Sequence, residues 1–241
     1  MEYYIFTLII LFCGAFIQGL TGFGSALVSL PVLVMFMDIH TAVPLCVLNG
    51  LVITAFLSMH LKSHLDWQKI GPLLAGCLPG IVAGAIFLKK TSEPIFLLLL
   101  GLMLISYALY RLLLNPKTRK LGKGWGVIAG FFTGAISAAF SAGGPPTIIY
   151  TTLTGWSKHE IKATLSLFFF MGGIFTVLAH LVSGIATPEA FRVFGYGLPG
   201  VLAGVLAGSL LYRRFKTEGY IRLILIALLL MGVMMLHSAF K

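Results

Sequence analysis

The chain has 241 residues, of which 59% are hydrophobic and 10% are charged, and its formal net charge is +10. A soluble domain carries about 25% charged residues, so this composition excludes a soluble protein and indicates an integral membrane protein. The basic residues separate apolar stretches instead of forming one basic face. This argues against nucleic acid as a partner and fits contacts with anionic membrane lipids.

Polar breaks divide the chain into eight apolar segments, at 4–37, 42–61, 69–89, 94–114, 125–153, 160–183, 190–212 and 219–238. A helix that crosses a membrane needs about 20 residues, and six segments fit that length. The first and the fifth segments are too long for one pass and too short for two. Each contains a glycine-rich break, so we expect a broken or re-entrant helix there, which enters the membrane and returns as a shorter helix.

The sequence repeats itself with a period of about 120 residues. The segment 78–84, LPGIVAG, returns as 198–204, LPGVLAG. This predicts a single transmembrane transporter domain over 1–241, built from one repeat at 1–120 and a second at 121–241. The glycines of the repeated motif recur every four residues, which predicts close packing of helix backbones in lipid.

The positions of the basic residues favour hairpins in the first and fifth segments. With hairpins, thirteen of the 17 Lys and Arg residues lie on one side of the membrane and four on the other. This is the bias of the positive-inside rule, so the basic side is expected in the cytoplasm and both termini outside. The repeats would then be inverted. Eight simple crossings would give parallel repeats and a nearly even division of charge, and this alternative stays open.

Each long segment has one break of small residues, at Gly22, Phe23, Gly24 and Ser25 in the first and at Ser141, Ala142, Gly143 and Gly144 in the second. Glycine lets a backbone approach a ligand, and each break can begin a helix. The unpaired N–H groups of a helix N-terminus bind anions. Two such ends that face each other near the midplane would form an anion site, and we predict that these eight residues bind the substrate. The alternative is that the glycines only permit close packing.

Other polar residues narrow the chemistry. All seven acidic residues lie at predicted segment ends or loops, whereas cation-coupled carriers commonly place a carboxylate in mid-span. The deep polar groups are neutral hydroxyls and amides, which favours an anion over a cation. The three cysteines lack the spacing of metal ligands, so neither a metal nor a cofactor is expected.

Four further residues are candidates for roles in transport. Phe23 and Phe140 flank the two breaks and are candidate gates on either side of the site. His60 and His180 are related by the repeat and are candidates for proton coupling, because histidine titrates near neutral pH.

The chain resembles the sulfite exporter TauE/SafE family of membrane permeases over essentially its whole length. The resemblance rests on 19–25, GLTGFGS, followed by Pro31, on the second break within 134–146, and on the repeated Leu-Pro-Gly layout. It implies a multi-pass transporter of the plasma membrane, usually bacterial, that moves sulfite, sulfonates or related organosulfur anions. The family's breaks tend to carry more glycine. Ser25 and Ser141-Ala142 depart from that pattern, which bears on the substrate more than on the fold.

We therefore expect an all-α polytopic membrane protein that moves a small anion by alternating access at a site between two repeats. Its expected partners are the anion and membrane lipids, and self-association stays open. The alternatives are an anion channel, a membrane scaffold that transports nothing, and a membrane-embedded serine hydrolase. The hydrolase would require Ser141 as nucleophile with His180 as its base.

Overall fold

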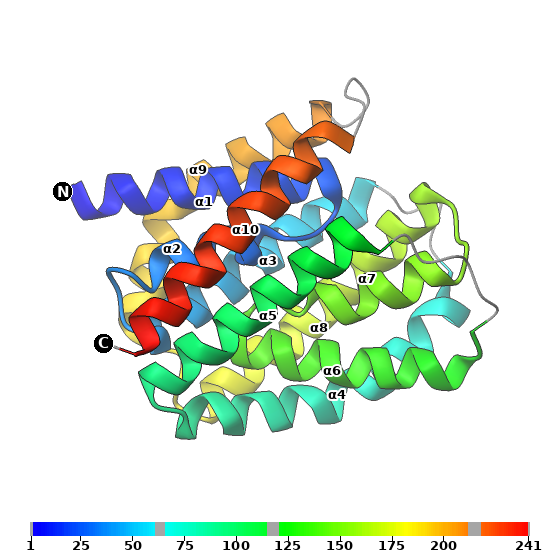
Figure 1. Ribbon diagram of the computed structural model, residues 1–241, viewed down its shortest axis with the longest axis horizontal. Helices are drawn as coiled ribbons and strands as arrows, with labels where there is room; N and C mark the ends of the chain where they lie inside the picture. The colour runs from blue at the N-terminus through cyan, green and yellow to red at the C-terminus, as the bar shows by residue number, and fades with distance from the viewer. Residues whose placement is uncertain (1, 61–65, 115–120, 212–217, 241) are drawn as a thin grey trace.

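The computed structural model describes residues 2–60, 66–114, 121–211 and 218–240, which form ten helices and no strand (Figure 1). The first half contains α1 (Glu2–Thr21), α2 (Ser25–Leu33), α3 (Ile39–His60), α4 (Trp67–Lys90) and α5 (Glu93–Leu113). The second half contains α6 (Lys123–Phe140), α7 (Gly144–Leu153), α8 (Lys158–Val182), α9 (Pro188–Leu211) and α10 (Glu218–Ala239). In each half, a long helix is followed by a short one and then by three long ones. The predicted boundary between the repeats adjoins 115–120, which lies outside the described residues.

Six of the described helices, α1, α3, α4, α5, α8 and α9, are long and apolar enough to cross a membrane. The apolar part of α10 that the structure describes, Ile224–Ala239, is shorter. Large apolar side chains remain exposed on the outer faces of the bundle, for example Leu210 and Leu230. Such surfaces are expected where lipid covers the protein. The prediction of an all-helical, multi-pass membrane protein is therefore confirmed. The first long segment differs from the expected re-entrant helix in one respect, because α1 alone is long enough to span the membrane.

The two halves contact each other reciprocally. Helix α4 packs along α6 of the second half, and α9 of the second half packs along α1 of the first. Helix α3 pairs with α8, and α5 pairs with α10, so equivalent helices meet each other (Figure 1). A two-fold relation between the halves produces this pattern, because each contact is then made twice with the halves exchanged.

Glycines bring the backbones of the paired helices into contact. A Cβ atom added to Gly76, Gly80 or Gly84 of α4 would overlap a carbonyl oxygen of α6. A Cβ atom added to Gly204 or Gly208 of α9 would overlap a carbonyl oxygen of α1. Close approach of this kind supplies the van der Waals contact that holds helices together in lipid.

The short helix α2 folds back along α1. Ser29 of α2 donates a hydrogen bond to the carbonyl oxygen of Ile10 on α1, at 3.2 Å. Nearer the reversal, Gln18 of α1 accepts hydrogen bonds from the hydroxyl and the N–H of Ser25, the first residue of α2. Residue numbers thus rise along one helix as they fall along the other, so α1 and α2 form an antiparallel hairpin.

The second half has an equivalent hairpin. Helix α7 returns along α6, and the hydroxyls of Thr133 on α6 and Thr147 on α7 share a hydrogen bond. The reversal contains Ser141 at φ 54°, the one non-glycine residue of the described chain with a positive φ. In the first hairpin, Gly22 and Gly24 take φ values of 88° and 95°, which favour glycine over any residue with a side chain.

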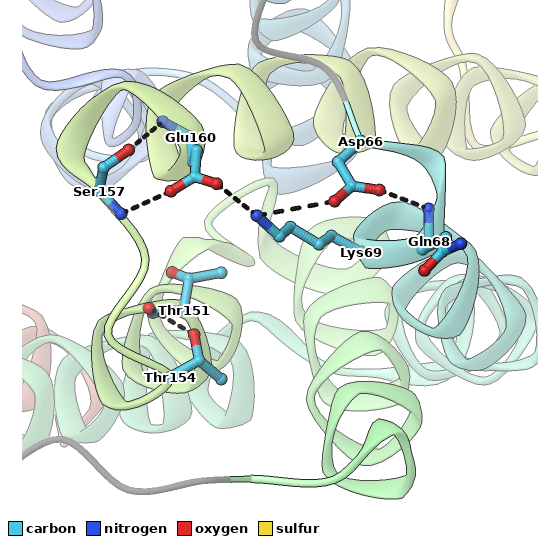
Figure 2. A network of polar contacts seen from close by, with 7 residues as sticks. All are labelled: Asp66, Gln68, Lys69, Thr151, Thr154, Ser157 and Glu160. Atoms are coloured by element: carbon cyan, nitrogen blue, oxygen red, sulfur yellow. Dashed lines mark hydrogen bonds and ion pairs between the residues drawn. The ribbon is translucent and has the colours of Figure 1, made fainter.

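The N-termini of α4 and α8 are capped by their own side chains and joined to each other. Asp66 accepts a hydrogen bond from the N–H of Gln68 at 2.9 Å, and Ser157 and Glu160 form a capping box at the start of α8. Lys69 of α4 donates to Glu160 of α8 at 2.6 Å, as Figure 2 shows. Because α4 and α8 belong to different halves, this ion pair links the halves at the ends of these helices.

Candidate functional site

The two reversals open onto one cavity of about 80 Å³, which we call the central cavity. One water molecule needs roughly 10–15 Å³ in the same measure, so this space accommodates a small anion. Its walls come from both halves: α1, α2, α3 and α4 from the first, and α6, α7 and α8 from the second. None of the described residues that line it is charged. Its polar groups are an amide, two thiols and several hydroxyls, from Gln18, Ser25, Cys46, Thr54, Cys77, Thr133, Ser137, Ser141 and Thr176.

Seven of the eight residues that we predicted to bind substrate line the central cavity, namely Phe23, Gly24, Ser25, Ser141, Ala142, Gly143 and Gly144. The two breaks also meet directly: a Cβ atom added to Gly144 would lie 3.6 Å from the ring of Phe23. The eighth residue, Gly22, does not line the cavity. It packs against Lys162, whose Cγ atom would lie 2.9 Å from a Cβ atom at position 22.

The helices α2 and α7 begin at the cavity wall. Their N-cap residues are Gly24 and Gly143, and neither start is capped by a hydrogen bond from the N-cap side chain. Within the described part of the chain, the N–H groups of Gly24, Gly143 and Gly144 have no hydrogen-bond partner. Such groups bind anions, and the helix dipole adds about half a positive charge at each start.

The start of α7 differs from a simple helix N-terminus, because Pro145 and Pro146 have no N–H to donate. The backbone donors of this break therefore come from Ala142, Gly143 and Gly144. The glycine at position 143 is required for space, because a Cβ atom there would overlap the carbonyl oxygen of Thr133. Its φ of −70° is ordinary for any residue, so the constraint is steric.

The two candidate gates occupy different environments. Phe23 lines the central cavity. Phe140 is buried in an aromatic cluster, with its ring centroid 4.8 Å from that of Phe96 and 5.9 Å from that of Phe87. Phe140 does not line the central cavity, and the position equivalent to Phe23 in the second half is Ala142. An aromatic ring therefore borders the cavity at the first break and not at the second.

The two candidate histidines also differ, and neither lines the cavity. His60 is exposed at the end of α3, where its Nδ1 atom lies 2.8 Å from the carbonyl oxygen of Phe56. His180 is buried in α8, and its Nε2 atom lies 2.8 Å from the carbonyl oxygen of Ala138, near the end of α6. Among the described residues, no hydrogen bond joins His180 to Ser141, as the hydrolase alternative would require.

A buried cation that the sequence pattern did not indicate lies behind the first break. Lys162 of α8 is only 5% exposed, and its Nζ atom donates to the carbonyl oxygen of Gly19 at 3.0 Å. Gly19 and Ala138 are 119 positions apart, at equivalent places in the last turns of α1 and α6. Side chains of α8 thus contact both equivalent carbonyls, and at Gly19 the helix dipole favours the positive charge of Lys162.

The cysteines offer no metal centre. Cys46 and Cys77 are free thiols that line the central cavity, and Cys13 is exposed elsewhere on α1. In the part of the chain that the structure describes, no three His, Cys, Asp or Glu side chains come together as metal ligands would.

Comparison with known proteins assigns the chain to a family. The family model described as sulfite exporter TauE/SafE matches residues 6–235, which is nearly the whole chain. No curated protein and no solved structure matches it. The family match agrees with the resemblance that the two breaks carry in the sequence, and with the six apolar helices of spanning length among the described residues. The chain therefore belongs to the sulfite exporter TauE/SafE family of membrane transporters.

Proposed function

We propose that this protein moves a small anion, namely sulfite, a sulfonate or a related organosulfur anion, across the cell membrane of a bacterium. The observation that carries the proposal is the central cavity, where two helices from different halves begin. The N–H groups of Gly24, Gly143 and Gly144 at these starts have no hydrogen-bond partner among the described residues. The family supports the class of substrate. The cavity supports the sign of its charge, because N–H and hydroxyl groups line it and none of the described lining residues carries a carboxylate.

The anion would exchange part of its hydration for hydrogen bonds from both breaks. On one side the donor is the N–H of Gly24, and on the other the donors are the N–H groups of Gly143 and Gly144 and the hydroxyl of Ser141. The hydroxyl of Ser25 donates to Gln18 and borders the site. A hydrogen bond to a charged group contributes about 1.5–3 kcal/mol, so a few donors suffice to bind an oxyanion. Sites without a full countercharge also release their ligand readily, which transport requires.

Alternating access would follow from the reciprocal packing of the halves. If the halves rock about the cavity, the α1–α2 hairpin closes it toward one side of the membrane and the α6–α7 hairpin toward the other. Phe23, which lies against Gly144, would serve as the gate on the first side. In this proposal both hairpins are re-entrant, and the repeats are inverted.

The inverted arrangement has a direct test in intact cells. With three full crossings in each half, a short epitope tag fused to either terminus is expected to bind antibody from outside the cell. The positive-inside rule supports this orientation, because the ends of α5 and α9 then meet cytoplasmic loops rich in Lys and Arg. Tags reachable only after the membrane is permeabilised would contradict the inverted arrangement.

The function is tested by flux into proteoliposomes that contain the purified protein. Labelled sulfite and a panel of short sulfonates are offered, and we expect saturable uptake of at least one, with the others competing. Flux that rises without saturation would favour an anion channel. No flux of any anion in the panel, from protein that is folded and inserted, would reject the proposed function and favour the scaffold alternative.

A further inference from the structure

A second, smaller cavity of about 30 Å³ lies beside the central cavity, on the other side of the first turn of α2. Phe23, Gly24 and Leu27 line both cavities, so this turn is the wall between them. The remaining walls come from the end of α1, from α5 and from α10, which contacts both α2 and α5 (Figure 1). The two spaces are thus separated by a single turn of a nine-residue helix.

Arg111 is the one charged side chain among the described residues that line either cavity. It is half-buried near the end of α5, and Tyr107 lines the same wall one turn earlier. No ion pair joins Arg111 to an acidic side chain in the described part of the structure. A guanidinium group matches the oxygens of a sulfite or sulfonate group through paired N–H donors.

The second cavity lies toward the ends of α5 and α10 that adjoin loops rich in Lys and Arg. Its lining residues on α5 and α10 lie near the ends of those helices that adjoin 115–120 and 212–217. These loops carry Lys117, Arg119, Lys120, Arg213, Arg214 and Lys216, which the positive-inside rule assigns to the cytoplasm. The central cavity is lined instead by the middle turns of α3 and α8.

We propose that the second cavity is a cytoplasmic access site, where Arg111 binds the sulfite or sulfonate group before the first turn of α2 admits it to the central cavity. The proposal rests on the proposed function and extends it to the route of the substrate. A cation at the mouth of a pathway raises the local concentration of anions and their rate of capture. In this proposal the wall turns about Gly22 and Gly24, the two glycines with positive φ values on either side of Phe23.

The test measures how fast an anion reaches the central cavity, independently of transport. Gly50 lines that cavity and has open space where a Cβ atom would lie, so Gly50→Cys places a thiol there. The three native cysteines are replaced by alanine. Inside-out vesicles are treated with anionic 2-sulfonatoethyl methanethiosulfonate or with neutral methyl methanethiosulfonate, and the ratio of the two labelling rates is measured.

Arg111→Gln is expected to lower the anionic-to-neutral ratio about tenfold from the cytoplasmic face, and Arg111→Lys to lower it less. When the reagents are added from the outer face, both variants should keep the anionic-to-neutral labelling ratio of the parent. Lys123→Gln is the matched control, because Lys123 is an exposed cation on the same side that lines neither cavity. Its ratio should equal that of the parent.

An unchanged ratio in folded Arg111→Gln protein would overturn the access site, and so would a thiol that neither reagent reaches from the cytoplasm. A ratio that depends on the content of anionic lipid would assign Arg111 to a lipid headgroup instead. Sulfite flux in the same preparations separates this proposal from the proposed function. Flux with an unchanged ratio rejects only the access site, whereas a lowered ratio without flux rejects only the transport of these anions.

Discussion

Gly143→Val is expected to reduce the flux of sulfite and sulfonates to the level of empty liposomes, in protein that still folds and inserts. A Cβ atom at position 143 would overlap the carbonyl oxygen of Thr133 and the hydroxyl of Ser137, both on α6. The start of α7 must therefore move away from α6, and the N–H groups of the second break no longer point at the same place in the cavity. Flux is measured in proteoliposomes, and folding by size-exclusion chromatography and thermal unfolding.

Gly195→Val is the matched control for this variant. It places the same side chain on α9, at a glycine with open space around its Cβ position, and should transport as the parent does. Gly144→Ala is a milder change at the site, since its Cβ atom would meet Ile148 at 3.2 Å and the ring of Phe23 at 3.6 Å. We expect partial loss of flux in Gly144→Ala. Normal flux through correctly folded Gly143→Val protein would remove the second break from the site.

Lys162→Met is expected to reduce flux about tenfold or more, with a smaller loss of thermal stability. Methionine keeps an apolar chain against Gly22 but removes the hydrogen bond to the carbonyl oxygen of Gly19. A hydrogen bond from a charged group is worth about 1.5–3 kcal/mol, and about 1.4 kcal/mol corresponds to a tenfold change in rate. Because Gly19 and Gly22 lie in the four residues before Phe23, the lost contact changes the position of the first break.

Lys90→Met provides the comparison, because it removes an exposed lysine at the end of α4, far along the helix from either break. Its flux and its unfolding temperature should both stay at the parent values. If folded Lys162→Met protein transports at the parent rate, the contact between Lys162 and α1 serves stability alone and has no part in positioning the first break.

The places where the chain reverses can be predicted from the sequence, because glycine and proline act locally. The helix boundaries at Thr21 and Ser25, and at Phe140 and Gly144, coincide with the runs of small residues in the two long segments. The 120-residue repeat and the four-residue spacing of its glycines likewise predict that glycines of α4 and α9 face other helices. These signals depend on residues close together in the chain, so one sequence is enough to see them.

Contacts between distant segments could not be predicted in this way. Lys162 lies at the start of an apolar segment, where a lysine usually faces the membrane surface, yet it reaches Gly19, 143 positions earlier. Phe140 immediately precedes a break, but the helix turns its ring toward Phe96 and away from the cavity. His60 and His180 are equivalent by repeat, and only His180 contacts the end of a broken helix. In each case the direction of a side chain decides the role, and the repeat does not fix that direction.

The central claim is that a small anion binds between the two breaks, held by main-chain N–H groups from both halves. Electron cryomicroscopy of the protein in lipid nanodiscs, with a transported sulfonate at saturating concentration, tests it most directly. We predict density for the sulfonate group in the central cavity, within hydrogen-bonding distance of Gly24 on one side and of Gly143 or Gly144 on the other. Density for the anion only outside this cavity, or two breaks packed together with no space between them, would contradict the claim.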